Sequence, residues 1–106
     1  MGFFSFLTGP DINQEILHYA DTKNAVLLDV RTPEEYRNGH IPESINLPLQ
    51  DISQVEKHLT DRSAPLFVYC LSGARSRQAV SLLTKMGYKT VTNIGGISSY
   101  KGKVVK

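Results

Sequence analysis

Two short, nearly continuous apolar runs constrain the fold of this chain more than any other feature of its sequence. They are AVLLDV at residues 25–30 and PLFVY at residues 65–69. Runs of this kind fit strands that are covered on both faces, as the strands of a parallel sheet are. The two runs therefore predict a sheet with helices packed against both of its sides.

Helix signals alternate with the strand signals along the chain. Asp11 can cap a helix that starts at residue 12, and Thr32, Pro33 and Glu35 form the start of a short second helix. We expect two more helices, one that starts at a capping box at residues 53–56 and one over residues 75–86. We also expect strands at residues 44–47 and 90–94. This order predicts an α/β fold with a central, mostly parallel five-stranded sheet flanked by helices on both faces.

The length and composition of the chain suit one compact domain. It has 106 residues, of which 41% are hydrophobic and 21% are charged. We expect residues 11–106 to form a single domain and the apolar segment at residues 1–10 to pack on it as a short strand or staple. That segment is too short to cross a membrane, and no Lys or Arg precedes it as in a signal peptide.

Charge and cysteine content exclude several classes of protein. The net charge is only +2 and the basic residues are dispersed, which argues against nucleic acid as a partner. A single cysteine cannot form an internal disulfide, so nothing requires an oxidising compartment. The three histidines share no metal-ligand spacing with one another or with Cys70. We therefore expect a cytoplasmic monomer with no metal, no cofactor and no membrane partner.

The candidate site is the sequence CLSGARS at residues 70–76, which directly follows the second apolar run. Sites in parallel sheets gather at the carboxyl ends of the strands. Gly73 permits a tight turn that points backbone N–H groups inward, and the next helix adds its free N–H groups and positive dipole end. Arg75 supplies a cation, and Ser72 and Ser76 supply hydroxyl donors. Each of these influences favours the thiolate of Cys70.

Two other interpretations of Cys70 compete with a sulfur-handling nucleophile. A lone cysteine after a strand is more often an inert buried residue, but such a residue is not usually followed by Ser, Gly, Arg and Ser in a turn. Cysteine phosphatases also use a loop that ends in arginine, with the spacing C-x5-R. Here Cys70 and Arg75 are spaced C-x4-R, which is tight for a tetrahedral phosphate but can enclose a sulfur bound to the cysteine.

Taken together, these segments resemble the rhodanese family of sulfurtransferases. The resemblance rests on LDVRTPEEY at residues 28–36, GHIP at 39–42, IN at 45–46, VYCLSGARS at 68–76 and NIGG at 93–96. It spans roughly residues 11–102. It implies a mostly parallel sheet with flanking helices, and a cysteine that carries sulfane sulfur from thiosulfate or a persulfide donor to cyanide, a thiol or a sulfur-accepting protein.

The resemblance also implies roles for single residues. Cys70 would be the nucleophile and sulfur carrier. The backbone amides of the loop would cradle the persulfide; they belong to Leu71, Ser72, Gly73, Ala74 and Arg75. The Arg75 side chain would bind anionic thiosulfate with support from Ser76. Asp29 and Arg31 would be mainly structural, with Arg31 reaching toward the rim of the site.

One departure from the family pattern lies near the C-terminus. Where the family commonly places tryptophan after the glycine pair, this chain has Tyr100. This substitution concerns the packing around the pocket rather than the loop. A catalytically silent binding or scaffold module with the same fold is the alternative that a persulfide test would distinguish.

Overall fold

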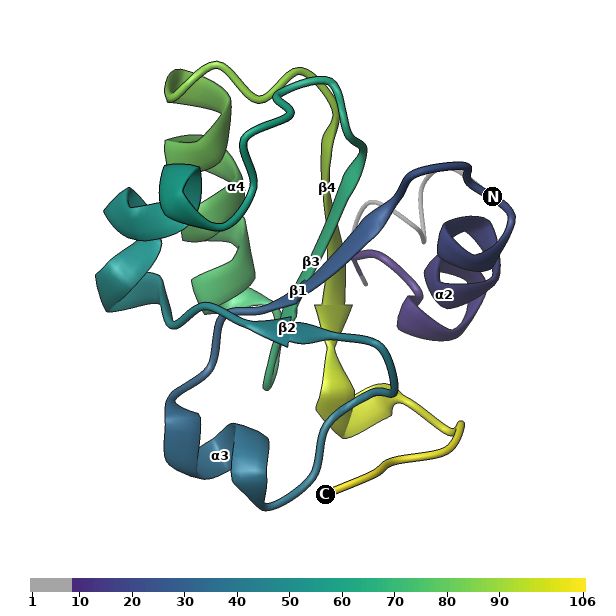
Figure 1. The fold of residues 1–106 in the computed structure, drawn as a ribbon. Coiled ribbons are helices and arrows are strands. Elements are labelled where there is room, and N and C mark those ends of the chain that lie inside the picture. The colour runs from purple at the N-terminus through teal and green to yellow at the C-terminus, as the bar shows by residue number, and fades with distance from the viewer. Residues whose placement is uncertain (1–8) are drawn as a thin grey trace.

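A computed structural model describes residues 9–106 of the chain (Figure 1). In chain order its elements are α2 (Ile12–Ala20), β1 (Val26–Asp29), α3 (Pro33–Arg37), β2 (Ile45–Asn46), the 3-10 helix η1 (Leu49–Lys57), β3 (Leu66–Cys70), α4 (Ala74–Lys85), β4 (Val91–Gly96) and the 3-10 turn η2 (Ile97–Ser99). Helices and strands alternate as the sequence predicted.

The strands form one parallel sheet in the order β2-β1-β3-β4. The prediction of five strands is wrong for the described residues, which contain four. These four are the segments expected as strands at residues 25–30, 44–47, 65–69 and 90–94, and no further segment of residues 9–106 pairs with an edge of the sheet; the C-terminal residues contribute only an isolated antiparallel bridge between Val105 and His40. A short strand or staple was also predicted within residues 1–10, but residues 1–8 lie outside the described part of the chain.

Side chains of successive strand residues alternate between two cores, one on each face of the sheet. Leu28, Val68 and Cys70 point toward the side covered by α4 and η1. Leu27 and Phe67 point toward the side covered by α2. Figure 1 shows α2 and α4 on opposite sides of the sheet. Burial on both faces explains why β1 and β3 are almost entirely apolar, and the predicted packing of helices on both sides of the sheet is confirmed.

Two of the predicted helix starts are confirmed in atomic detail. The Asp11 carboxylate accepts the Asn13 backbone N–H at 3.0 Å at the start of α2. At the start of α3, the Thr32 hydroxyl accepts the Glu35 N–H, and the Glu35 carboxylate accepts the Thr32 N–H. These reciprocal bonds form the predicted capping box and fix where Glu35 sits.

The third predicted helix start is wrong. The capping box expected at Ser53 does not mark the start of η1, which begins four residues earlier, at Leu49, and is interrupted by a kink at Asp51, where the backbone is not helical. A tertiary contact sets this start: the Leu49 N–H donates to the carbonyl of Val30, at the end of β1, at 3.0 Å. Within residues 9–106, no helix is long and apolar enough to cross a bilayer.

Candidate active site

Cys70 is the last residue of β3 and lies at the carboxyl end of the sheet, where its side chain is only 1% exposed. The chain turns in three residues and enters α4 at Ala74. Gly73 makes this turn possible, because its φ of +105° lies in the left-handed region that side chains with a Cβ resist. The turn points the Gly73 N–H back at the sulfur.

The Cys70 sulfur lies among hydrogen-bond donors. Its Sγ is 3.0 Å from the Gly73 nitrogen and 3.5 Å from the Ser76 Oγ. Burial alone raises the pKa of Cys70, but hydrogen bonds from the Ser76 hydroxyl and from the backbone of Ser76, Gly73 and Ser72 outweigh it, so the pKa is lowered. The loop thus favours a thiolate in a site with little access to water.

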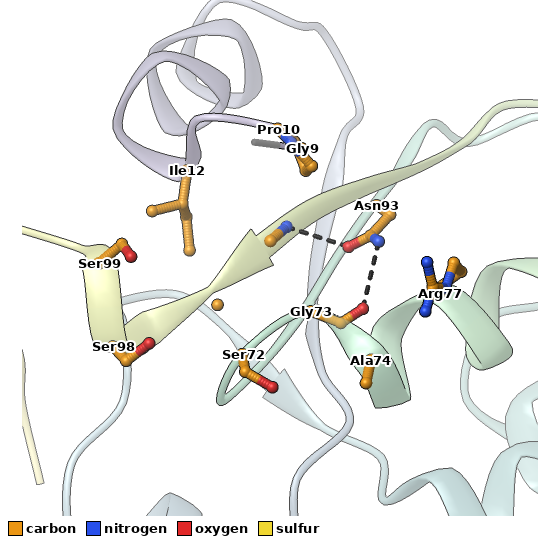
Figure 2. Close-up of a pocket in the computed structure, with 12 residues that line it drawn as sticks. Gly9, Pro10, Ile12, Ser72, Gly73, Ala74, Arg77, Asn93, Ser98 and Ser99 are labelled. Carbon is orange, nitrogen blue, oxygen red and sulfur yellow. Dashed lines mark hydrogen bonds between the residues drawn. The ribbon is translucent and has the colours of Figure 1, made fainter. Parts of the chain in front are cut away.

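Asn93 in β4 positions the hydroxyl of Ser76. The Asn93 Oδ1 accepts the Ser76 hydroxyl at 2.7 Å and the Gly95 N–H at 3.0 Å; the Gly73 carbonyl at 3.0 Å and the Cys70 Sγ at 3.5 Å compete for the same hydroxyl proton. Its Nδ2 donates to the Gly73 carbonyl at 3.3 Å, as Figure 2 shows. Sequence analysis named Asn93 only as part of a family segment. The residues around it give no local signal, because the same segment also carries Thr90 and Thr92.

We predict that Ser76→Ala raises the pKa of Cys70, because the substitution removes the side-chain donor that does most to lower it. The pH profile of Cys70 alkylation by iodoacetamide should move to higher pH, with a several-fold slower rate at neutral pH. Ser81→Ala, on an exposed part of the same helix, is the control and should leave the profile in place. An unmoved profile in Ser76→Ala would show that the hydroxyl does not stabilise the thiolate.

The end of β4 forms the floor beneath the loop. The Ser98 N–H donates to the Leu71 carbonyl at 3.1 Å. A Cβ built on Gly96 would lie 2.1 Å from the Leu71 carbonyl oxygen and 2.6 Å from the Ser72 Cα. Only glycine allows so close an approach, so Gly96 determines the depth at which the loop sits.

Arg75 is held by a carboxylate from α3. Its Nη1 lies 2.7 Å from Glu35 Oε1, and its Nη2 lies 3.0 Å from Oε2. Arg75 lowers the pKa of Glu35 to about 2, with help from the Thr32 hydrogen bonds. Sequence analysis expected Arg75 to supply a cation for an anionic donor. It identified Glu35 only as a helix-capping residue and not as the partner of Arg75.

The other loop residues divide between the rim and the interior. Leu71, Ser72 and Ala74 are exposed, and Ser76 is fully buried beside the sulfur. A cavity of about 410 Å³ lies next to the loop, between the start of α4, the end of β4 and the start of α2; Ser72, Gly73 and Asn93 are among its lining residues (Figure 2). Among residues 9–106, no three His, Cys, Asp or Glu side chains gather in a way that could hold a metal ion.

Asp29 and Arg31 form a buried ion pair below the loops. Arg31 Nη2 lies 2.7 Å from Asp29 Oδ2 and also donates to the Gly39 carbonyl at 2.7 Å. Asp29 additionally accepts the Arg31 backbone N–H at 2.9 Å. These bonds direct the Arg31 guanidinium toward the turn at Gly39, and they tie the end of β1 to that turn.

The fold and the loop together define a class of protein. It is an α/β domain with a parallel sheet, in which a buried thiol at a strand end is followed by a three-residue turn that leads into a helix. The sequence profile of the family described as rhodanese-like domain matches residues 13–103. This chain therefore belongs to the rhodanese-like domain family, as its segments suggested.

Named relatives within the family include sulfurtransferases. The chain is 36% identical over 80 residues to the thiosulfate sulfurtransferase PspE of Escherichia coli, covering 74% of this chain and 77% of that protein. It is 39% identical over 82 residues to a sulfurtransferase of Allochromatium vinosum, covering 76% of each. Among solved structures, a rhodanese-related protein from Thermoplasma volcanium is 36% identical with a TM-score of 0.73, covering 92% of this chain and 98% of that one.

Proposed function

We propose that this protein is a sulfurtransferase that carries a sulfane sulfur on Cys70, from thiosulfate or a persulfide donor to cyanide or a thiol. The observation that carries the proposal is the Cys70 Sγ, buried at the end of β3 and 3.0 Å from the Gly73 nitrogen. A nucleophile with a lowered pKa needs no separate general base.

The reaction proceeds in two balanced displacement steps. The Cys70 thiolate attacks the outer sulfur of thiosulfate and forms a sulfur–sulfur bond, while the bond to the sulfonate sulfur breaks and sulfite leaves with the electron pair. Cyanide or a thiolate then attacks the outer sulfur of the Cys70 persulfide. This breaks the new bond and returns the electron pair to Cys70, so no oxidant or reductant is consumed.

The loop stabilises the charge in both steps. Within the proposal, the amides of Leu71, Ser72, Gly73, Ala74 and Arg75 cradle the outer sulfur of the persulfide, with Ser76 at its base. Donors fixed by the fold need no reorganisation when charge develops, which makes them more effective than water. The bond from Gly73 to the sulfur supports this role.

The assay for this function follows both products of thiosulfate and cyanide. The purified protein should release thiocyanate and sulfite in equal amounts, at rates proportional to protein concentration. Failure to form a persulfide with thiosulfate or an organic persulfide, together with slow alkylation of Cys70 at neutral pH, would favour the silent scaffold. Cys70-dependent hydrolysis of an aryl phosphate would favour a phosphatase instead.

Arg75→Ala should weaken thiosulfate use more than it weakens alkylation of Cys70. The substitution leaves the Glu35 carboxylate without its counter-charge beside the site, and the resulting repulsion of the thiosulfate dianion costs on the order of 2 kcal/mol, or roughly 30-fold in kcat/KM. Lys85→Ala removes an exposed cation from the far end of the same helix and is the matched control. Equal losses in the two variants would show that Arg75 contributes only general positive charge.

The proposal extends to the setting of the reaction. A location in the cytoplasm suits a single-cysteine protein, because thiol acceptors are abundant in a reducing compartment. We also expect the protein to be a monomer. A sulfur-accepting protein is a further possible acceptor. Size-exclusion chromatography with light scattering and cell fractionation test the monomer and the location.

A further inference from the structure

We infer that Glu35 sets the donor preference of the site by cancelling the charge of Arg75, so that the site does not favour the thiosulfate dianion over sulfane donors with a single negative charge. The inference rests on the proposed function and deepens it. It concerns which donor class the Cys70 loop accepts best, and it assigns that choice to a residue that lies outside the loop.

The geometry of the ion pair is the first step. Glu35 engages both Nη atoms of Arg75, at 2.7 and 3.0 Å, in a bidentate arrangement. These two Nη groups are also the donors with which a guanidinium binds a planar or tetrahedral anion through two parallel hydrogen bonds. A dianionic donor must therefore displace Glu35 or bind without these Nη groups of Arg75.

The rigidity of Glu35 is the second step. Its Oε1 also accepts the Thr32 N–H at 3.0 Å and lies 3.1 Å from the Thr32 hydroxyl. The capping box thus fixes the carboxylate in front of Arg75. With a pKa of about 2, Glu35 stays ionised at every pH at which the reaction would be measured.

The charge balance is the third step. Arg75 and Glu35 cancel one another, and so do the buried Arg31 and Asp29. Arg77 also lines the cavity but is exposed, where water and salt screen its charge, so the backbone amides of the loop remain as the close donors for the substrate. Neutral donors of this kind discriminate little between one and two negative charges, whereas an uncompensated guanidinium would favour the dianion.

Two donors that differ mainly in charge test the inference. Thiosulfate carries two negative charges, and benzenethiosulfonate carries one; the Cys70 thiolate attacks the sulfane sulfur of either, and sulfite or benzenesulfinate leaves with the electron pair. We compare kcat/KM for the two donors with cyanide as acceptor. In Glu35→Gln the ratio of thiosulfate to benzenethiosulfonate should rise by roughly tenfold, because Arg75 loses its counter-charge.

Both Glu35→Gln and its control, Glu34→Gln, are expected to keep the fold of the wild-type protein. Glutamine at position 35 can still accept the Thr32 N–H, so the capping box survives. Glu34→Gln removes the neighbouring, exposed carboxylate of the same helix turn and should leave the ratio unchanged. An unchanged ratio in Glu35→Gln, or an equal rise in Glu34→Gln, would overturn the inference.

A measurement on the wild-type protein covers the case in which Glu35→Gln does not fold. Because the site is charge-compensated, the ratio of the two kcat/KM values should change little between low and high ionic strength. A ratio that falls steeply with salt would reveal an uncompensated cation and contradict the inference. If the wild type transfers sulfur from neither donor, the proposed function itself fails, which is a different outcome from an unchanged ratio.

Discussion

Replacing Cys70 with serine should reduce thiosulfate:cyanide sulfur transfer to the uncatalysed rate, a loss of roughly 10³-fold or more. A serine hydroxyl is not ionised at neutral pH and forms no persulfide, so the two-step route is closed. The measurement is thiocyanate formation at saturating thiosulfate, with the wild-type protein measured in parallel.

Stability measurements separate this loss of activity from a loss of fold. Cys70 is fully packed among the apolar residues between the sheet and α4, and the serine side chain is only slightly smaller than that of cysteine. The Gly73 N–H and the Ser76 hydroxyl can both bond to a serine oxygen. We therefore expect a folded variant with a cooperative thermal transition. A folded Cys70→Ser variant with wild-type activity would contradict the persulfide mechanism.

Gly96→Ala should produce the second large effect, because its Cβ would lie 2.1 Å from the Leu71 carbonyl oxygen. The Leu71 carbonyl oxygen is a backbone atom and cannot rotate out of the way as a side chain can, so the loop must move by about 1 Å. A displacement of that size moves the Gly73 N–H off the sulfur and can cost about 10²-fold in rate. Overpacking of this kind also destabilises a fold by about 1–3 kcal/mol.

The readouts for Gly96→Ala are sulfur transfer, thermal unfolding and the pH profile of Cys70 alkylation. The profile should move to higher pH because the displaced loop no longer stabilises the thiolate. Ser98→Ala, two residues later, is the control: its backbone N–H still donates to Leu71, so all three readouts should stay near wild type. A Gly96→Ala protein with an unmoved alkylation profile would show that the loop does not rest on β4 as described.

Features encoded within a few residues of sequence were predictable. The Thr32 and Glu35 capping box, the Asp11 cap and the apolar runs of β1 and β3 follow from local physical chemistry, and each is found where it was expected. The loop after Cys70 is equally local. Its close donors, Gly73 and Ser76, lie within six residues of the sulfur.

Features set by contacts between distant segments were not predictable in this way. Glu35 and Arg75 are 40 residues apart, and nothing near either residue indicates that they pair. Asn93 reaches Ser76 only because β4 pairs with β3. The start of η1 depends on the Val30 carbonyl rather than on the local capping signal at Ser53.

The central claim is that Cys70 carries the transferred sulfur, and intact-protein mass spectrometry tests it most directly. After incubation with thiosulfate and removal of excess donor, the wild-type protein should gain the mass of one sulfur atom. Peptide mapping should place that sulfur on Cys70, and cyanide should remove it with release of one thiocyanate per protein. A wild-type protein that transfers sulfur to cyanide without ever gaining this mass, or that gains it equally in Cys70→Ser, would contradict the account.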